Sequence, residues 1–219
     1  MILSFELNYF KRVAKINYIL LTFYLSLSIS AHAIANRLVL IDGYPIISAG
    51  LIYMSTFILT DIFASFNPRK LVIMMISLEA FANFIYIAYT NWISSMPYPA
   101  YFHHADAYTT VFRPIIILYL ANLGGTFIAA VVDLFIFYYL YKTKRWPFFI
   151  SSFMSSIVTI TCYTLVTDYF GFRHSYPDHV FTLTNINLIT NFITLAFYAI
   201  VGQFIVVFIQ KYLHKDIQQ

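Results

Sequence analysis

Charged residues are scarce in this sequence. Only 10% of its 219 residues are Asp, Glu, Lys or Arg, and 61% are hydrophobic. A soluble domain carries roughly 25% charged residues. A soluble fold of this size has no interior large enough to bury so much apolar surface, whereas a lipid bilayer covers it. The composition therefore predicts an integral membrane protein.

Cysteine and the common catalytic motifs are also scarce. A single Cys162 excludes an internal disulfide, an iron–sulfur site and a dithiol redox pair. There is no His-Glu-x-x-His metal motif and no Gly-x-Ser-x-Gly nucleophile elbow. The adjacent His103 and His104, followed by Asp106, cannot easily share one ion. We expect no enzymatic activity, no cofactor and no metal, and no ATP hydrolysis by this chain alone.

Long hydrophobic runs dominate what is present. A transmembrane helix needs about 20 consecutive apolar residues, and these runs are too long and uniform for barrel strands. The sequence predicts an all-α polytopic membrane protein with six transmembrane helices, in a single domain over residues 1–219. The predicted spans are Ile16–Asn36, Tyr44–Phe66, Leu71–Ile93, Phe112–Tyr141, Pro147–Phe170 and Ile186–Gln210.

The basic residues alternate between the connecting segments. Ten of them fall on one side of the six-span arrangement, whereas only Arg37 and Arg173 fall on the other and Arg113 lies within the fourth span. Because Lys and Arg gather on the cytoplasmic side, both termini are expected in the cytoplasm. The net charge of +4 then reflects topology and requires no nucleic-acid partner. The ten residues are Lys11, Arg12, Lys15, Arg69, Lys70, Lys142, Lys144, Arg145, Lys211 and Lys215.

The N-terminus has a second interpretation. Basic residues, an apolar run from Ile16 and the sequence Ala31-His32-Ala33 are also typical of a cleaved signal peptide. The run is longer than most signal-peptide cores, and its removal would upset the charge alternation. We therefore interpret it as the first transmembrane helix.

A few polar side chains lie within the predicted spans, where a charge at mid-bilayer costs at least about 2.5 kcal/mol. Glu79 lies deepest, about 12 Å into the third span, and Asn83 shares its helical face. Asp61 and Asp133 fall at one level near the cytoplasmic side, and Arg113 and Asp168 fall near the outer side. The intramembrane amides are Asn36, Asn83, Asn122, Asn187, Asn191 and Gln203.

Each of these residues has a structural and a functional interpretation. Asp61 and Asp133 either reach toward the basic loops or line a solute path. Arg113 and Asp168 can form an ion pair at the outer rim. Glu79 is either a neutral acid that joins two helices, or a group that binds solute or carries a proton. The asparagines either join helices or bind solute.

Several short motifs follow one another in the order of a known family. They include a small-residue step in the second span and two aspartates that precede basic loops. In order they are Ala35-Asn36-Arg37-Leu38-Val39, Ser48-Ala49-Gly50, Thr60-Asp61-Ile62, Arg69-Lys70, Ala121-Asn122-Leu123, Asp133-Leu134-Phe135-Ile136-Phe137 and Ser151-Ser152. Over nearly the whole chain, the sequence resembles the vitamin uptake transporter family, whose known members import queuosine precursors, the 7-deazaguanine bases.

The chain departs from that family's pattern at four places. Tyr53-Met54 replaces a Tyr-Pro step, and Arg113 lies one turn from the usual arginine position. Thr159-Ile160 replaces an Asp-Thr pair, and Ile189 stands where a lysine is common. Some of the polar groups that could contact substrate are therefore changed.

The resemblance implies a multi-pass importer in the bacterial inner (plasma) membrane, for a purine-like solute such as 7-cyano- or 7-aminomethyl-7-deazaguanine. The alternative is a substrate-binding membrane subunit of a multi-component vitamin uptake system. The expected partners are the solute and the lipid bilayer, and the sequence leaves homo-oligomer formation open. The candidate solute-binding residues are Asn36, Asp61, Glu79, Asn83, Asn122, Asp133, Asn187 and Asn191.

Overall fold

Helices make up almost all of the fold. The computed structural model describes residues 2–34, 37–173 and 177–214, with the backbone alone for residues 2–8, 113–124, 171–172 and 214. In this part of the chain, six helices are long and apolar enough to cross a membrane. The prediction of an all-α polytopic membrane protein is therefore confirmed.

Each predicted span corresponds to one helix, although several helices begin earlier than predicted. The first, fourth and sixth extend beyond their apolar stretches, because hydropathy detects only the part of a helix that suits lipid. The helices are α1 (Ile2–Ala33), α2 (Ser48–Phe66), α3 (Arg69–Ser94), α4 (Ala105–Tyr138), α5 (Phe148–Phe172) and α6 (Val180–His214), with a π-helical turn η1 (Tyr139–Thr143) directly after α4.

A β-hairpin precedes α2, where the sequence predicted the start of the second span. Strands β1 (Leu38–Ile41) and β2 (Tyr44–Ile47) pair antiparallel. Asp42 and Gly43 form the turn with positive φ angles of 50° and 82°, which suits a two-residue hairpin loop. The prediction that the second span begins at Tyr44 is wrong, because the apolar strand residues read as part of a membrane helix.

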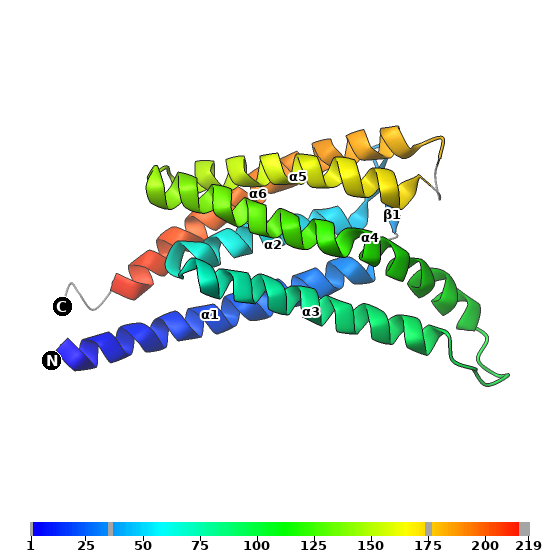
Figure 1. Cartoon of the computed structure of the whole chain (residues 1–219), viewed down its shortest axis with the longest axis horizontal. Coiled ribbons are helices and arrows are strands. Elements are labelled where there is room, and N and C mark those ends of the chain that lie inside the picture. The colour runs from blue at the N-terminus through cyan, green and yellow to red at the C-terminus, as the bar shows by residue number, and fades with distance from the viewer. Residues whose placement is uncertain (1, 35–36, 174–176, 215–219) are drawn as a thin grey trace.

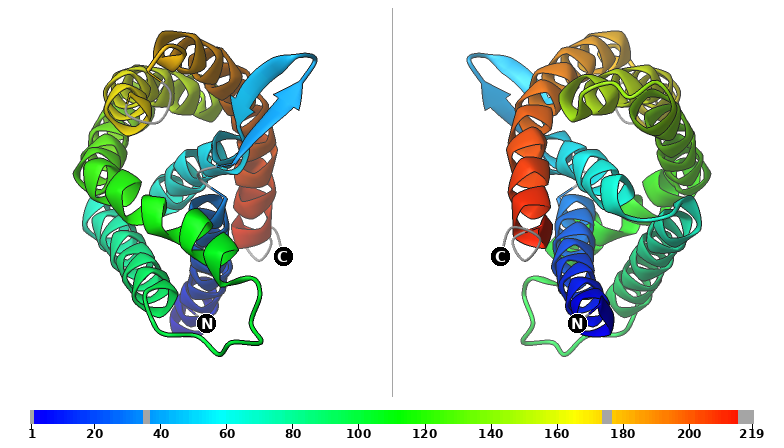
Figure 2. Two further views of the ribbon diagram at one scale, coloured as in Figure 1. Left: turned by 90° about the vertical axis from the view of Figure 1, so that its right-hand side faces the viewer. Right: turned by 90° about the vertical axis from the view of Figure 1, so that its left-hand side faces the viewer.

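The helix α2 lies inside the bundle. It contacts each of the other five helices, and α1, α3, α4, α5 and α6 follow one another around it (Figures 1 and 2). In its membrane-spanning stretch 67% of the residues are buried, compared with 17–39% in the other helices. The polar side chains of α2 from Ser55 to Ser65 are therefore buried within the protein.

Close packing around α2 depends on glycine at one crossing. A Cβ atom at Gly202 of α6 would stand 2.6 Å from Ile58 Cγ2 on α2 and 3.0 Å from the Phe148 ring at the start of α5. Only a residue without a side chain fits at this distance. Gly202 therefore brings the backbone of α6 close to both helices.

The beginning of α1 and the end of α6 lie at the same end of the bundle (Figure 1). Basic side chains are bonded to the protein there: the Arg12 guanidinium donates to the Tyr212 carbonyl at 3.1 Å, and Lys142 Nζ donates to the Ser65 carbonyl at 2.5 Å. The connections that follow α2 and α4, which contain Arg69, Lys70, Lys142, Lys144 and Arg145, also lie at this end. We propose that it faces the cytoplasm.

Reporter fusions test this orientation. Fusions after Lys70 and Lys144 are expected to read cytoplasmic, whereas fusions at Gly43 and His104 are expected to read external. The reason is the preference of Lys and Arg for the cytoplasmic side. A cytoplasmic signal at His104, with an external one at Lys70, would reverse the assignment.

Candidate functional site

Two buried aspartates meet in the interior of the bundle. Asp61 of α2 and Asp133 of α4 are both 0% exposed, and their carboxyl groups interact electrostatically. Ser152 Oγ of α5 donates to Asp61 Oδ2 at 2.5 Å, and the hydroxyls of Ser155 and Ser156 lie beside Asp133. The interpretation that these aspartates reach toward the basic loops is wrong, since both point into the bundle.

The sequence of α5 explains why another helix approaches the acid pair. Ser151, Ser152, Ser155 and Ser156 are all 0% exposed and recur at helical spacing on one face. Small side chains on that face permit close helix packing. Three of them, Ser152, Ser155 and Ser156, also place hydroxyl groups beside the acid pair.

Glu79 and Asn83 lie together on α3, as their spacing predicts. Their exposed fractions are 4% and 1%. Asn83 Nδ2 donates to Glu79 Oε1 at 2.6 Å and to Ser28 Oγ at 2.8 Å. Ser28 Oγ of α1 also donates to Glu79 Oε1. The cluster therefore joins α1 to α3 and holds one oxygen of the Glu79 carboxyl group with two donors.

A third polar cluster lies between α5 and α6. Asn187 Nδ2 donates to Asp168 Oδ2 at 2.7 Å, and Asn191 Nδ2 donates to Thr164 Oγ1 at 3.3 Å. Asp168, Asn187 and Asn191 are buried. Asp168 thus has an amide partner, and the side chain of Arg113, its predicted ion-pair partner, lies outside the described residues.

Gly50 brings α2 against this third cluster. A Cβ atom at Gly50 would stand 2.9 Å from Asn191 Oδ1 and 3.3 Å from Asn187 Oδ1. The glycine of the Ser48-Ala49-Gly50 step therefore leaves room for two amide oxygens beside the α2 backbone. The small-residue step, found in the sequence as a family motif, has a direct packing role.

The substitution Gly50→Ala is expected to destabilise the protein by about 1–3 kcal/mol, the usual cost of overpacking. The added methyl group would displace the two asparagines and reduce solute uptake. Thermal unfolding of the purified protein in detergent measures the change.

Gly125→Ala is the matched control, because its Cβ atom would make an ordinary 3.5 Å contact with Thr167 Cγ2. Equal stability losses for the two variants would contradict the close packing at Gly50.

Buried tyrosine side chains surround the Glu79 cluster, and one of them also lies near the Asp168 cluster. The Glu79 carboxyl group lies within electrostatic range of the hydroxyls of Tyr24, Tyr53 and Tyr163. Tyr163 also lies within range of Asp168. The Tyr163 hydroxyl therefore lies within electrostatic range of a carboxyl group in each of the two clusters.

Buried oxygen atoms without a hydrogen-bond partner gather in these three clusters. Leaving such an atom unpaired costs about 1–3 kcal/mol, so each one needs an explanation. Six of them are carboxyl or amide oxygens, which accept hydrogen bonds unless a carboxyl group is protonated, and the seventh is a hydroxyl. Among the described residues they are Asp61 Oδ1, Asn83 Oδ1, both oxygens of Asp133, Asn187 Oδ1, Asn191 Oδ1 and Ser156 Oγ.

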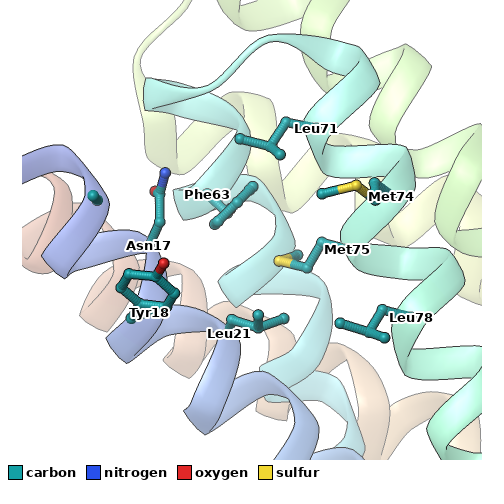
Figure 3. Close-up of a pocket in the computed structure, with 9 residues that line it drawn as sticks. Asn17, Tyr18, Leu21, Phe63, Leu71, Met74, Met75 and Leu78 are labelled. Carbon is teal, nitrogen blue, oxygen red and sulfur yellow. The ribbon is translucent and has the colours of Figure 1, made fainter. Parts of the chain in front are cut away.

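An apolar cavity of about 280 Å³ lies away from these clusters, between α1, α2 and α3 (Figure 3). Leucine, methionine and phenylalanine side chains dominate its lining, and Met74 on its wall is 61% exposed. The amide of Asn17 is paired with that of Asn67 by reciprocal 2.9 Å hydrogen bonds. This lining suits an acyl chain better than a polar solute.

Six of the eight predicted site residues are placed by the structure, and all six are buried. They fall into the three clusters, with Asp61 and Asp133 in the first, Glu79 and Asn83 in the second, and Asn187 and Asn191 in the third. The other two, Asn36 and the side chain of Asn122, lie outside the described residues.

Sequence reasoning missed several polar neighbours of these residues. Ser28 carries no charge and alternates with Ser26 and Ser30 along the first predicted span, so nothing in the sequence distinguishes it from its neighbours. The serine face that includes Ser152 and Ser156 was visible as a small-residue repeat in α5. Asp168 was singled out, but with a different partner.

A comparison with protein families gives a match over most of the chain. Residues 48–216 match a family model described as "putative vitamin uptake transporter". This segment covers α2 to α6 and therefore all three polar clusters, apart from Ser28. No curated protein and no solved structure matches the chain.

Proposed function

We propose that this chain, which belongs to the vitamin uptake transporter family, imports a purine-like base of the 7-deazaguanine class. The chain is a multi-pass membrane protein of a transporter family. The proposed site for the solute is the interior region between Glu79 and Asn83 on one side and Asn187 and Asn191 on the other. The proposed location is the bacterial inner membrane.

The observation that carries the proposal is the set of unpaired acceptors in this region. Asn83 Oδ1, Asn187 Oδ1 and Asn191 Oδ1 are buried and lack a donor within the described part of the chain. The amide orientation of Asn187 is set by the Asp168 carboxyl group, which accepts its Nδ2–H group. A 7-deazaguanine base presents ring N–H groups and an amino group, so it supplies the missing donors.

The remaining features suit the same ligand. The Glu79 carboxyl group can accept from an N–H and amino edge, a charge-assisted interaction. Tyr53 and Tyr163 offer ring faces to a planar base. The solute would cross the membrane chemically unchanged, because neither the sequence nor the described site contains an activated nucleophile.

Feeding experiments test the substrate. Cells unable to make queuosine precursors should regain queuosine-modified tRNA when they express this chain and receive a 7-deazaguanine base. Cells with an empty vector should not. If no deazapurine is taken up while another small solute is, the substrate assignment fails and the family assignment is unaffected.

Reconstitution distinguishes an autonomous importer from a subunit of a larger uptake complex. The purified chain alone in liposomes is expected to exchange labelled base for unlabelled base without ATP. If it binds the base but moves it only after ATP-driven partner subunits are added, the chain is a substrate-binding subunit.

A further inference from the structure

The Asp61–Asp133 pair lacks a positive partner. Asp61 accepts only from Ser152, at 2.5 Å, and neither oxygen of Asp133 has a donor. No Lys, Arg or His side chain of the described ranges bonds either carboxyl group. Two negative charges in a closed apolar interior would repel each other and lose their hydration.

The groups that face the pair from the packed helices are neutral. The α5 side contributes serine hydroxyls, and two basic side chains next to the cytoplasmic ends of α2 and α4 contact other groups. Lys142 Nζ donates to the Ser65 carbonyl at 2.5 Å, and the Arg69 guanidinium lies 4.6 Å from the centre of the Phe135 ring. The closed structure therefore needs a cation on the pair, and a proton is the smallest one available.

A second observation points to the same place. Ser156 Oγ is fully buried, lies beside the Asp133 carboxyl group and has no hydrogen-bond partner within the described residues. A hydroxyl can donate to a carboxylate or accept from a carboxylic acid. Ser156 can therefore serve Asp133 in both protonation states.

We propose that the Asp61–Asp133 pair is the proton-carrying site of this transporter, separate from the solute site, and that each solute is imported together with a proton. In the proposed cycle one carboxylate binds a proton from outside to become a carboxylic acid, and releases it to the cytoplasm. No bond of the solute changes.

The place of the pair in the fold gives this step a mechanical effect. Asp61 lies on the enclosed helix α2, and Asp133 lies on α4. With one proton bound, only one of the two carboxyl groups is charged, and α2 and α4 can keep the arrangement seen here. After the proton leaves, the two negative charges repel and favour separation of α2 from α4.

Proteoliposomes test the proposal, which rests on the proposed function. Wild-type protein is expected to accumulate a labelled deazaguanine base up to about tenfold per pH unit, acidic outside, for one proton per solute. In separate experiments, Asp133→Asn and Asp61→Asn should continue to exchange labelled for unlabelled base but accumulate none. Asp106→Asn, at an exposed acid, is the matched control and should accumulate like the wild type.

A second measurement needs no variant. Adding solute to wild-type proteoliposomes without a gradient should acidify the lumen, as read by a trapped pH dye. If wild-type protein exchanges the base but neither accumulates it in a pH gradient nor acidifies the lumen, the proton proposal is overturned. Accumulation driven only by a sodium gradient, or retained in both variants, also overturns it. Absence of any exchange by the wild type counts instead against the proposed solute.

Discussion

The substitution Glu79→Gln is expected to leave the protein in the membrane at normal levels and to weaken solute binding roughly 30- to 150-fold, which corresponds to losing about 2–3 kcal/mol of charge-assisted hydrogen bonding. The glutamine carbonyl can still accept from Ser28 and Asn83, which bond Glu79 Oε1. The other carboxyl oxygen is replaced by an amide NH2 group, which donates and cannot accept from a donor-rich solute. Equilibrium binding of labelled base to the purified variant measures the loss.

The competing account of Glu79 is structural, since its cluster joins α1 to α3. On that account Glu79→Gln would lower the unfolding temperature or leave the protein unaffected, and solute affinity would stay near the wild-type value. Asp106→Asn serves as the matched loss of an exposed carboxylate. Unchanged affinity in Glu79→Gln would remove this residue from the solute site.

The substitution Asn191→Leu is expected to reduce solute affinity by about 1–3 kcal/mol, roughly 5- to 150-fold, with little loss of stability. The Asn191 side chain makes one long hydrogen bond to Thr164, at 3.3 Å, and its Oδ1 atom has no partner in the part of the chain that the structure describes. Leucine has a similar shape, so the fold loses little when it replaces the amide. The solute loses an acceptor.

The chain offers a matched control on the same helix. Asn185 is exposed, and Asn185→Leu should leave solute affinity unchanged. Binding isotherms and unfolding temperatures of both variants separate the two roles. A large stability loss in Asn191→Leu with unchanged affinity would show that this asparagine only joins helices.

The six helices could be predicted because the bilayer sets a length and an apolar composition that are legible in one sequence. The depth of polar residues in the membrane could also be predicted: the direction and length of their helices place Asp61 and Asp133 at one level. The contact between the two aspartates could not be predicted, because neither helix sequence indicates which other helix packs beside it. The enclosure of α2 decides that contact, and it is a property of the whole bundle.

The β-hairpin could not be predicted for a different reason, because its strands resemble part of a membrane span. Its Asp42-Gly43 turn is a strong local signal, but the strands on either side are apolar enough to be read as the start of a span. The role of Ser28 could not be predicted for a third reason: Ser26, Ser28 and Ser30 alternate along one helix, and the sequence does not show which of them contacts another helix. Its bond to Glu79 depends on how α1 packs against α3.

The enclosed position of α2 also has a consequence for how the chain is made. This helix carries Asp61 and several buried hydroxyls, and a charged aspartate within an isolated helix opposes insertion, by up to about 2.5–3.5 kcal/mol at the helix centre and by less near the end, where Asp61 lies. Lipid offers these groups no partner, whereas Ser152 of a helix synthesised about 90 residues later does. During synthesis α2 therefore enters the bilayer before the side chains that satisfy it exist. Its apolar neighbours Met54, Phe57 and Ile62 must hold it there until α4, α5 and α6 arrive, so a chain interrupted before α5 should be a preferred substrate of membrane quality control.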